Sequence, residues 1–284
     1  FGKEGFMSAF FENIKKQMRR GKSPESSLDA MPQTYCDISN LGHFDRAWLA
    51  KTFADPGIAK EWMVDAERIG GLEMPEMTGG VNPGDRRALY YLVRRLKPKS
   101  FLEIGTHIGS STVSLASAMT RNSENGVGGQ IISVDIRDVN CDESRPLLDA
   151  KAPMSHKAFL KALGLEQCVT FEVNTAVSRL QNRREQFDVI FLDGDHSNLA
   201  VYSEIPLALD RLSGISNGLI ILHDYFPDLK PIWPGEEPLA GPYLAVKKLL
   251  EQGAEFSVLP LGELPWPTKL GSQTTSLAIL TRNE

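Results

Sequence analysis

From residue 83 onward, short apolar runs alternate regularly with helical patterns. Pro83–Leu96 predicts a helix with a proline in its first turn. The runs that follow are rich in β-branched and aromatic residues and cover Ser100–Ile104, Gln130–Val134, Cys168–Val173, Phe187–Leu192 and Gly218–Leu222. Nearly continuous apolar strands separated by helices are typical of a parallel sheet that is covered on both faces.

The last two runs, Glu255–Leu259 and Thr275–Leu280, have no comparable helix between them and predict a hairpin-like closing pair. Together the seven runs predict an α/β fold with a doubly wound, mostly parallel seven-stranded sheet. We expect this sheet domain to span residues 81–284.

The first 80 residues have a different character. Amphipathic stretches at Met7–Arg20, Arg46–Phe53 and Ala59–Ile69 are separated by helix breakers. They predict a helical N-terminal extension over residues 1–80, with Asp45 as the N-cap of the second stretch. The basic residues of Met7–Arg20 would also fit a membrane-surface helix, but a solvated face or a subunit contact is favoured. A homo-oligomer formed through this region is therefore one expectation.

Composition narrows the functional classes. The 284 residues carry a formal net charge of -5 at pH 7, which gives no electrostatic support for nucleic-acid binding. The three cysteines, Cys36, Cys141 and Cys168, are too few and too far apart for a disulfide framework, which favours a cytoplasmic protein. No apolar run approaches the roughly 20 residues of a membrane helix. No signal-peptide pattern is visible, although removal of a leader before Phe1 stays an open alternative.

The first predicted strand ends in a glycine-rich turn, Glu103 to Gly109, which leads into a helix. Glycines let the backbone approach a ligand closely, and in a doubly wound sheet this turn lies at the crevice where ligands bind. The next strand ends in Asp135, where a carboxylate can accept hydrogen bonds from ribose hydroxyls. The two features together predict a nucleoside-binding site.

The spacing separates two cofactor classes. A dinucleotide site requires Gly-x-Gly-x-x-Gly, whereas this turn reads Glu-x-Gly-x-x-x-Gly, with His107 where a second glycine would be needed. Glu103 would also lie poorly beside a pyrophosphate, but it suits a cofactor that carries an ammonium group and a sulfonium. An NAD(P)-dependent oxidoreductase and a non-catalytic nucleoside-binding module remain the alternatives.

Four segments taken in order, FLEIGTHIGSST, ISVDIR, FDVIFLDGDHS and GLIILHDY, resemble the class I S-adenosylmethionine-dependent methyltransferases. The similarity covers about residues 80–284, and it is greatest to the small-molecule O-methyltransferase branch with an LDGDHS element. The resemblance implies a Rossmann-like methyltransferase fold and S-adenosyl-L-methionine as cofactor. It implies that the cofactor site is formed by Glu103, Gly105, Thr106, His107, Gly109, Ser111, Asp135, Asn174 and Asp193, with Thr175 beside Asn174 at the adenine.

The catalytic chemistry is expected at the ends of the fourth and fifth strands, which read Asp193-Gly194-Asp195-His196 and His223-Asp224-Tyr225. If these strands are neighbours, three carboxylates and two histidines converge, which is costly without a cation. Asp193 and Asp224 are predicted to bind Mg²⁺ or another divalent cation, and His223 is a further candidate metal ligand or base. Asp195 or His196 is predicted to be the general base.

Structural interpretations compete with these assignments. Asp195 and His196 could cap the next helix, and His223 could be a hydrogen-bonded structural residue. The proline-rich segment 226–243, with Trp233, could bind the acceptor or could be a plain connector. His43 and His156 are predicted to lie on the surface. The sequence thus predicts an O-methyltransferase that acts, with help from a divalent metal, on a hydroxyl of a small molecule such as a sugar or a polyhydroxylated natural product.

Overall fold

The computed structural model of the chain describes residues 44–72, 80–143, 145–149, 152, 154–213, 218–229, 239–269 and 272–283. The predicted helix Met7–Arg20, Cys36, His43 and Trp233 lie outside the described residues. The chain divides into two compact units, Phe1–Cys36 and Asp37–Glu284. All elements described below belong to the second unit.

A seven-stranded sheet forms the centre of this unit, with the strand order β3-β2-β1-β4-β5-β7-β6. The five strands from β3 to β5 are parallel, and β7 is antiparallel to both β5 and β6. The predicted doubly wound sheet and its closing pair are confirmed. The strands are β1 (Ser100–Ile104), β2 (Gln130–Asp135), β3 (Val169–Val173), β4 (Val189–Leu192), β5 (Leu219–Leu222), β6 (Phe256–Pro260) and β7 (Ala278–Arg282).

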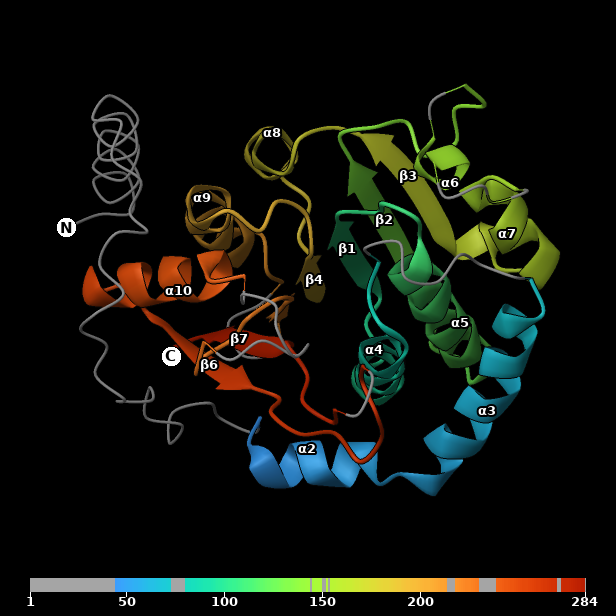
Figure 1. Cartoon of the computed structure of the whole chain (residues 1–284), viewed down its shortest axis with the longest axis horizontal. Helices are drawn as coiled ribbons and strands as arrows, with labels where there is room; N and C mark the ends of the chain where they lie inside the picture. Colours follow the sequence, from blue (N-terminus) through green and yellow to red (C-terminus); the bar gives the residue numbers. More distant parts are fainter. Residues whose placement is uncertain are drawn as a thin grey trace. The chain divides into compact units, whose positions relative to one another are not determined.

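Helices cover both faces of the sheet (Figure 1). One group contains α4 (Pro83–Leu96), α5 (Ser110–Glu124), α6 (Pro146–Asp149) and α7 (His156–Leu163), followed by the 3₁₀ helix η3 (Glu166–Cys168). The other contains α8 (Ala176–Asn182), α9 (Asn198–Asp210) and α10 (Gly241–Glu251). The chain reverses direction across the sheet after β3, so the later helices pack on the opposite face from α5.

Two further helices, α2 (Arg46–Phe53) and α3 (Pro56–Gly70), precede the sheet and correspond to two of the predicted amphipathic stretches. Asp45 caps α2, as predicted, by accepting a hydrogen bond from the backbone N–H of Trp48. Ion pairs join α3 to α4 and α5, with Arg94 Nε 2.7 Å from Glu61 and Arg121 Nη2 2.8 Å from Asp65. Both helices therefore belong to the compact unit that begins at Asp37.

The burial pattern explains why β4 and β5 consist of apolar residues alone. All four residues of β4 and all four of β5 are buried, because helices cover both faces of these strands. The parallel register brings the carboxyl ends of β1, β2, β4 and β5 to one edge: Ile104 is aligned with Val134 and Leu192, and Leu192 with Leu222. The predicted site residues follow these ends directly. Among the described helices, none combines the length and the hydropathy needed to cross a bilayer.

Candidate functional site

The turn after β1 adopts an unusual backbone conformation. Gly105, His107 and Gly109 all have positive φ angles, of 94°, 46° and 74°. A Cβ atom at Gly105 would lie 2.1 Å from the carbonyl oxygen of Asp193, so only glycine allows the turn to pack against the end of β4. The left-handed conformation of His107, a residue with a side chain, requires support from its surroundings.

Asp135 supplies part of that support at the end of β2. Its carboxylate accepts hydrogen bonds from the backbone N–H groups of His107, at 2.8 Å, and Arg137, at 2.9 Å. The side chain stays partly exposed at the sheet edge. Two large apolar side chains next to it are strongly exposed, Ile136 at 73% and Val173 at 60%. The edge therefore offers a carboxylate beside an uncovered apolar surface.

The third strand ends at the same place. The backbone N–H of Asn174 donates to the carbonyl oxygen of Asp135, and the Asn174 side chain accepts from the N–H of Thr175. Thr175 is the N-cap of α8. Both residues predicted at the adenine therefore lie beside Asp135, where they also organise the start of a helix.

Glu103 lies beneath the turn rather than at its surface. Its side chain is completely buried, and its oxygens accept hydrogen bonds from the hydroxyl groups of Ser111, Thr112 and Ser133 at 2.5 to 2.6 Å. Thr106 is also buried and is bonded to the Ser133 hydroxyl. Burial raises the pKa of Glu103 to about 7, despite the three hydroxyl donors. Glu103, Thr106 and Ser111 thus join β1, β2 and α5 under the turn.

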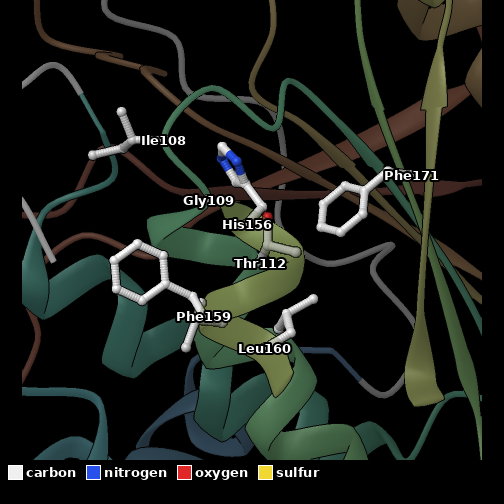
Figure 2. Close-up of a pocket in the computed structure, with 8 residues that line it drawn as sticks. Ile108, Gly109, Thr112, His156, Phe159, Leu160 and Phe171 are labelled. Carbon is white, nitrogen blue, oxygen red and sulfur yellow. The ribbon is translucent and has the colours of Figure 1, made fainter. Parts of the chain in front are cut away.

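His156 contradicts its predicted surface position, because it is only 3% exposed. Its ring Nδ1 lies 2.7 Å from the carbonyl oxygen of Val139, and Nε2 lies 2.8 Å from that of His107. Figure 2 shows the ring next to a small pocket between the turn, α5, α7 and β3. The pocket is lined by Ile108, Gly109, Thr112, Val113, His156, Phe159, Leu160 and Phe171. None of these lining residues carries a carboxylate, so the pocket is separate from the acidic residues predicted at the ends of β4 and β5.

At the ends of β4 and β5, His223 lies among three carboxylates. Its Nδ1 is 2.7 Å from Asp193 and 3.5 Å from Asp224, and its Nε2 is 3.4 Å from Asp85. Burial by itself lowers the pKa of His223, but the charges of Asp193 and Asp224 raise it well above its ordinary value. The ring is therefore a buried imidazolium that neutralises part of the surrounding negative charge.

This arrangement does not fit the predicted metal site. A metal-binding histidine must present a free lone pair, whereas both ring nitrogens of His223 face carboxylates. Over the described ranges, no three His, Cys, Asp or Glu side chains are grouped so as to hold a metal ion. The three predicted ligands, Asp193, His223 and Asp224, do come together, but in the structure they form an ion-pair cluster.

The loop after β4 places the two candidate bases differently. Asp195 is exposed, and its carboxylate accepts a hydrogen bond from the N–H of Ser197, which is the N-cap of α9. His196 Nδ1 lies 3.6 Å from Asp224, with 31% of its side chain exposed. Of the two histidines at the ends of β4 and β5, His196 is thus the more exposed, and its ring lies near the carboxylate of Asp224.

Asp224 itself has a positive φ of 52°, a conformation that is uncommon for a residue with a side chain. Burial raises its pKa, but His223, His196 and Lys269 outweigh this effect and hold the pKa below its usual value. Backbone strain of this kind is concentrated at functional sites. The ring of Tyr225, the next residue, lies 5.8 Å from the ring of Tyr243, measured between the centroids.

Comparison with known proteins identifies this architecture. A family model described as a methyltransferase domain matches residues 102–225. This part of the chain is thus similar to a methyltransferase domain. They contain the glycine turn, Asp135 and both carboxylate-bearing strand ends, so the predicted resemblance to the S-adenosylmethionine-dependent methyltransferases is confirmed.

Individual relatives agree with the family model. The chain is 25% identical over 142 residues to caffeoyl-CoA O-methyltransferase of Stellaria longipes, which corresponds to 48% of this chain and 52% of the relative. The chain thus matches about half the length of this curated relative.

Two solved structures confirm the predicted methyltransferase fold. The methyltransferase PaMTH1 of Podospora anserina, solved with SAH, has a TM-score of 0.50 and 18% identity, covering 89% of this chain and all of that one. The O-methyltransferase TomG of Streptomyces achromogenes, solved with SAM, has a TM-score of 0.50 and 16% identity, covering 81% and 91%.

Two residues of the site, Asp85 and His156, were not predicted from the sequence. Asp85 is completely buried in the first turn of α4, where Asn82 donates a 2.7 Å hydrogen bond to it. An aspartate near a helix start is normally a capping residue, so its sequence position gave no reason to place it beside His223. His156 likewise follows a capping serine, Ser155, and its burial depends on the turn that folds over it.

Proposed function

We propose that this protein is an S-adenosyl-L-methionine-dependent O-methyltransferase that acts on a hydroxyl of a small molecule, such as a sugar or a polyhydroxylated natural product. The observation that carries the proposal is a juxtaposition at the sheet edge. A nucleoside-type turn with Asp135 lies beside an acidic edge that holds His196, Asp193 and Asp224.

The cofactor fits the residues of this edge. The partly exposed Asp135 can accept hydrogen bonds from ribose hydroxyls, and the exposed Ile136 and Val173 offer an apolar surface for an adenine ring. Acidic groups near Asp193 suit a cationic ligand. When bound, the cofactor supplies a methyl group on a sulfonium, which an acceptor oxygen can take with sulfur as the leaving group. The SAM and SAH complexes of the structural neighbours are consistent with this assignment.

His196 is the residue we assign as general base. A hydroxyl is a weak nucleophile until its proton is removed, and the base must lie within reach of the acceptor. His196 is exposed enough to meet a substrate, and its Nδ1 faces Asp224, so Nε2 is free to take the proton. Asp224 then stabilises the imidazolium that forms. Asp195 is less suited, because its carboxylate supports the turn before α9.

His223 has a different role in this proposal. As a buried imidazolium it cannot accept a further proton, and it holds Asp193 and Asp224 in place at the sheet edge. Asp85 holds the other side of the ring. Since His223 lies between the carboxylates, we assign the neutralising charge at this edge to its side chain in place of a divalent cation.

Transfer of a labelled methyl group to a panel of hydroxylated small molecules tests the function. We expect the purified chain to methylate at least one member, and we expect His196→Gln to lower kcat by about 10²-fold or more because the base is lost. The matched control is Gln181→Ala, a change on α8 outside the site. Assays with and without EDTA report on the cation in the same experiment. A His196→Gln protein as active as the wild type would contradict the assignment of the base.

A further inference from the structure

The ring of His156 contacts the turn after β1, the proposed cofactor-binding turn, at two points. Nε2 lies 2.8 Å from the carbonyl oxygen of His107, the residue whose left-handed backbone shapes the turn. The ring also covers Gly109, since a Cβ atom there would lie 2.5 Å from His156 Cδ2. Figure 2 shows Gly109 and the imidazole next to each other. His156 therefore binds the carbonyl oxygen of His107, while the carboxylate of Asp135 accepts a hydrogen bond from its N–H.

The other ring nitrogen ties a second loop to the same residue. Nδ1 lies 2.7 Å from the carbonyl oxygen of Val139, in the loop after β2, and Asn140 accepts a hydrogen bond from the N–H of Lys157 on α7. The ring packs edge to face on Phe171, at 5.9 Å between the centroids. His156 thus links the turn after β1 with the loop after β2, the two segments on either side of Asp135.

Both contacts end on carbonyl oxygens, and this determines the protonation state that can make them. A carbonyl oxygen only accepts, so each bond needs an N–H on the ring. A neutral imidazole has one N–H, and its other nitrogen would then direct a lone pair at a carbonyl oxygen. Only the imidazolium donates to Val139 and His107 together.

We propose that His156 is a positioning residue for the cofactor site, which holds the turn at His107 and Gly109 in its binding conformation most firmly when the ring is protonated. The inference rests on the proposed function, because it takes S-adenosyl-L-methionine as the ligand of the turn. It predicts an affinity for the cofactor that depends on proton uptake by a side chain that does not contact the acceptor.

The charged groups around the ring determine the pH range of this effect. Burial and the charge of His107 lower the pKa of His156, whereas the two backbone hydrogen bonds and the carboxylate of Asp135 raise it. Burial is the largest effect, so the pKa remains below its ordinary value of 6.5. The ring is therefore mainly protonated, and able to donate both bonds, only below pH 6.5, and it loses one N–H donor as the pH rises. Because linkage is reciprocal, a ligand that needs the firm turn binds more tightly at low pH.

Calorimetric titration with S-adenosylhomocysteine between pH 5.5 and 8 tests the proposal on the full chain. Losing one charge-assisted hydrogen bond should weaken binding about tenfold over this range. His156→Gln should bind more weakly than the wild type at pH 5.5 and should lose the pH dependence. Lys161→Gln, which removes a positive charge from the exposed side of the same helix, should behave as the wild type.

A second measurement, on the wild type, tests the proposal even if His156→Gln does not fold. Nitrogen-15 NMR of labelled histidine in the wild type should show both ring nitrogens of His156 protonated at pH 5.5, with the cofactor product bound. A neutral ring under these conditions overturns the proposal, as does a His156→Gln protein with wild-type affinity and pH dependence. A wild type that binds no S-adenosylhomocysteine at any pH refutes the proposed function instead.

Discussion

Glu103 and His223 are both buried ionisable residues, and their neighbours determine opposite charge states. Glu103 is surrounded by hydroxyl groups, which can adapt to either form of the carboxyl, so burial dominates and raises its pKa to about 7. His223 is surrounded by carboxylates, whose charges outweigh burial and keep the ring protonated. Glu103 under the turn after β1 therefore stays protonated up to about pH 7, whereas His223 at the ends of β4 and β5 is a fixed cation.

The raised pKa of Glu103 makes the stability of the fold depend on pH. Below the ordinary pKa of 4.5 the carboxyl is neutral in both folded and unfolded chains, and no penalty arises. As the pH rises to about 7 and beyond, the unfolded chain loses this proton more readily, so folding is penalised by on the order of 3 kcal/mol. When the pH is raised from 5 to 8, we expect the free energy of unfolding to fall less in Glu103→Gln than in the wild type, as measured by urea unfolding. Identical pH dependence in the two proteins would refute the buried, raised-pKa carboxyl.

Single residues were predictable where one local pattern defined them. Gly105 and Asp135 follow strand ends, and their roles depend on the turn and on the sheet edge, both of which the apolar runs predict. Asp85 and His156 depend on contacts between segments far apart in the chain, 138 residues apart for Asp85 and His223. No local pattern in the sequence contains that information.

At the scale of elements, the start of α10 holds the loop that carries His196. A Cβ atom at Gly241 would lie 2.0 Å from the carbonyl oxygen of His196 and 2.8 Å from the N–H of Asn198. Both are backbone atoms, one of His196 itself and the other of the first residue of α9, so an added methyl group would have to push this backbone aside. The requirement for glycine at position 241 is thus set by the backbone of the loop after β4.

Gly241→Ala is therefore expected to displace His196 and to lower kcat by about tenfold or more, because a misplaced base loses its alignment with the acceptor. The KM for S-adenosyl-L-methionine should change little, since the turn and Asp135 lie elsewhere on the edge. Gly70→Ala is the matched control, because the added methyl group meets no atom within 4 Å. Unchanged kcat in a folded Gly241→Ala protein would show that the loop position does not matter for catalysis.

Elements were predicted better than their boundaries and order. The helix Pro83–Leu96 and the strand Ser100–Ile104 were predicted with their observed bounds, since proline and the apolar run define them. The fourth strand begins at Val189 rather than Phe187, because Phe187 forms only an isolated bridge with Leu212. The insertion of β7 between β5 and β6 is a matter of sheet pairing, which apolar patterns do not encode.

At the scale of the whole molecule, the sheet brings together chemistry that is spread over the chain. The turn after β1, Asp135 after β2, and the loops after β4 and β5 meet at one edge because their strands are parallel and in register. Helix α4 precedes the matched methyltransferase domain and adds Asp85 to the same edge. The N-terminal helices α2 and α3 pack on this layer and so form part of the folded unit.

A calorimetric titration of the wild type and of Asp135→Ala with S-adenosylhomocysteine tests whether a nucleoside cofactor binds at the turn after β1. We expect saturable binding by the wild type and a loss of affinity of at least about tenfold in the variant, because the ribose would lose its carboxylate acceptor and His107 its backbone support. No heat of binding with folded wild-type protein, or equal affinity in the two proteins, would contradict a nucleoside cofactor at this turn.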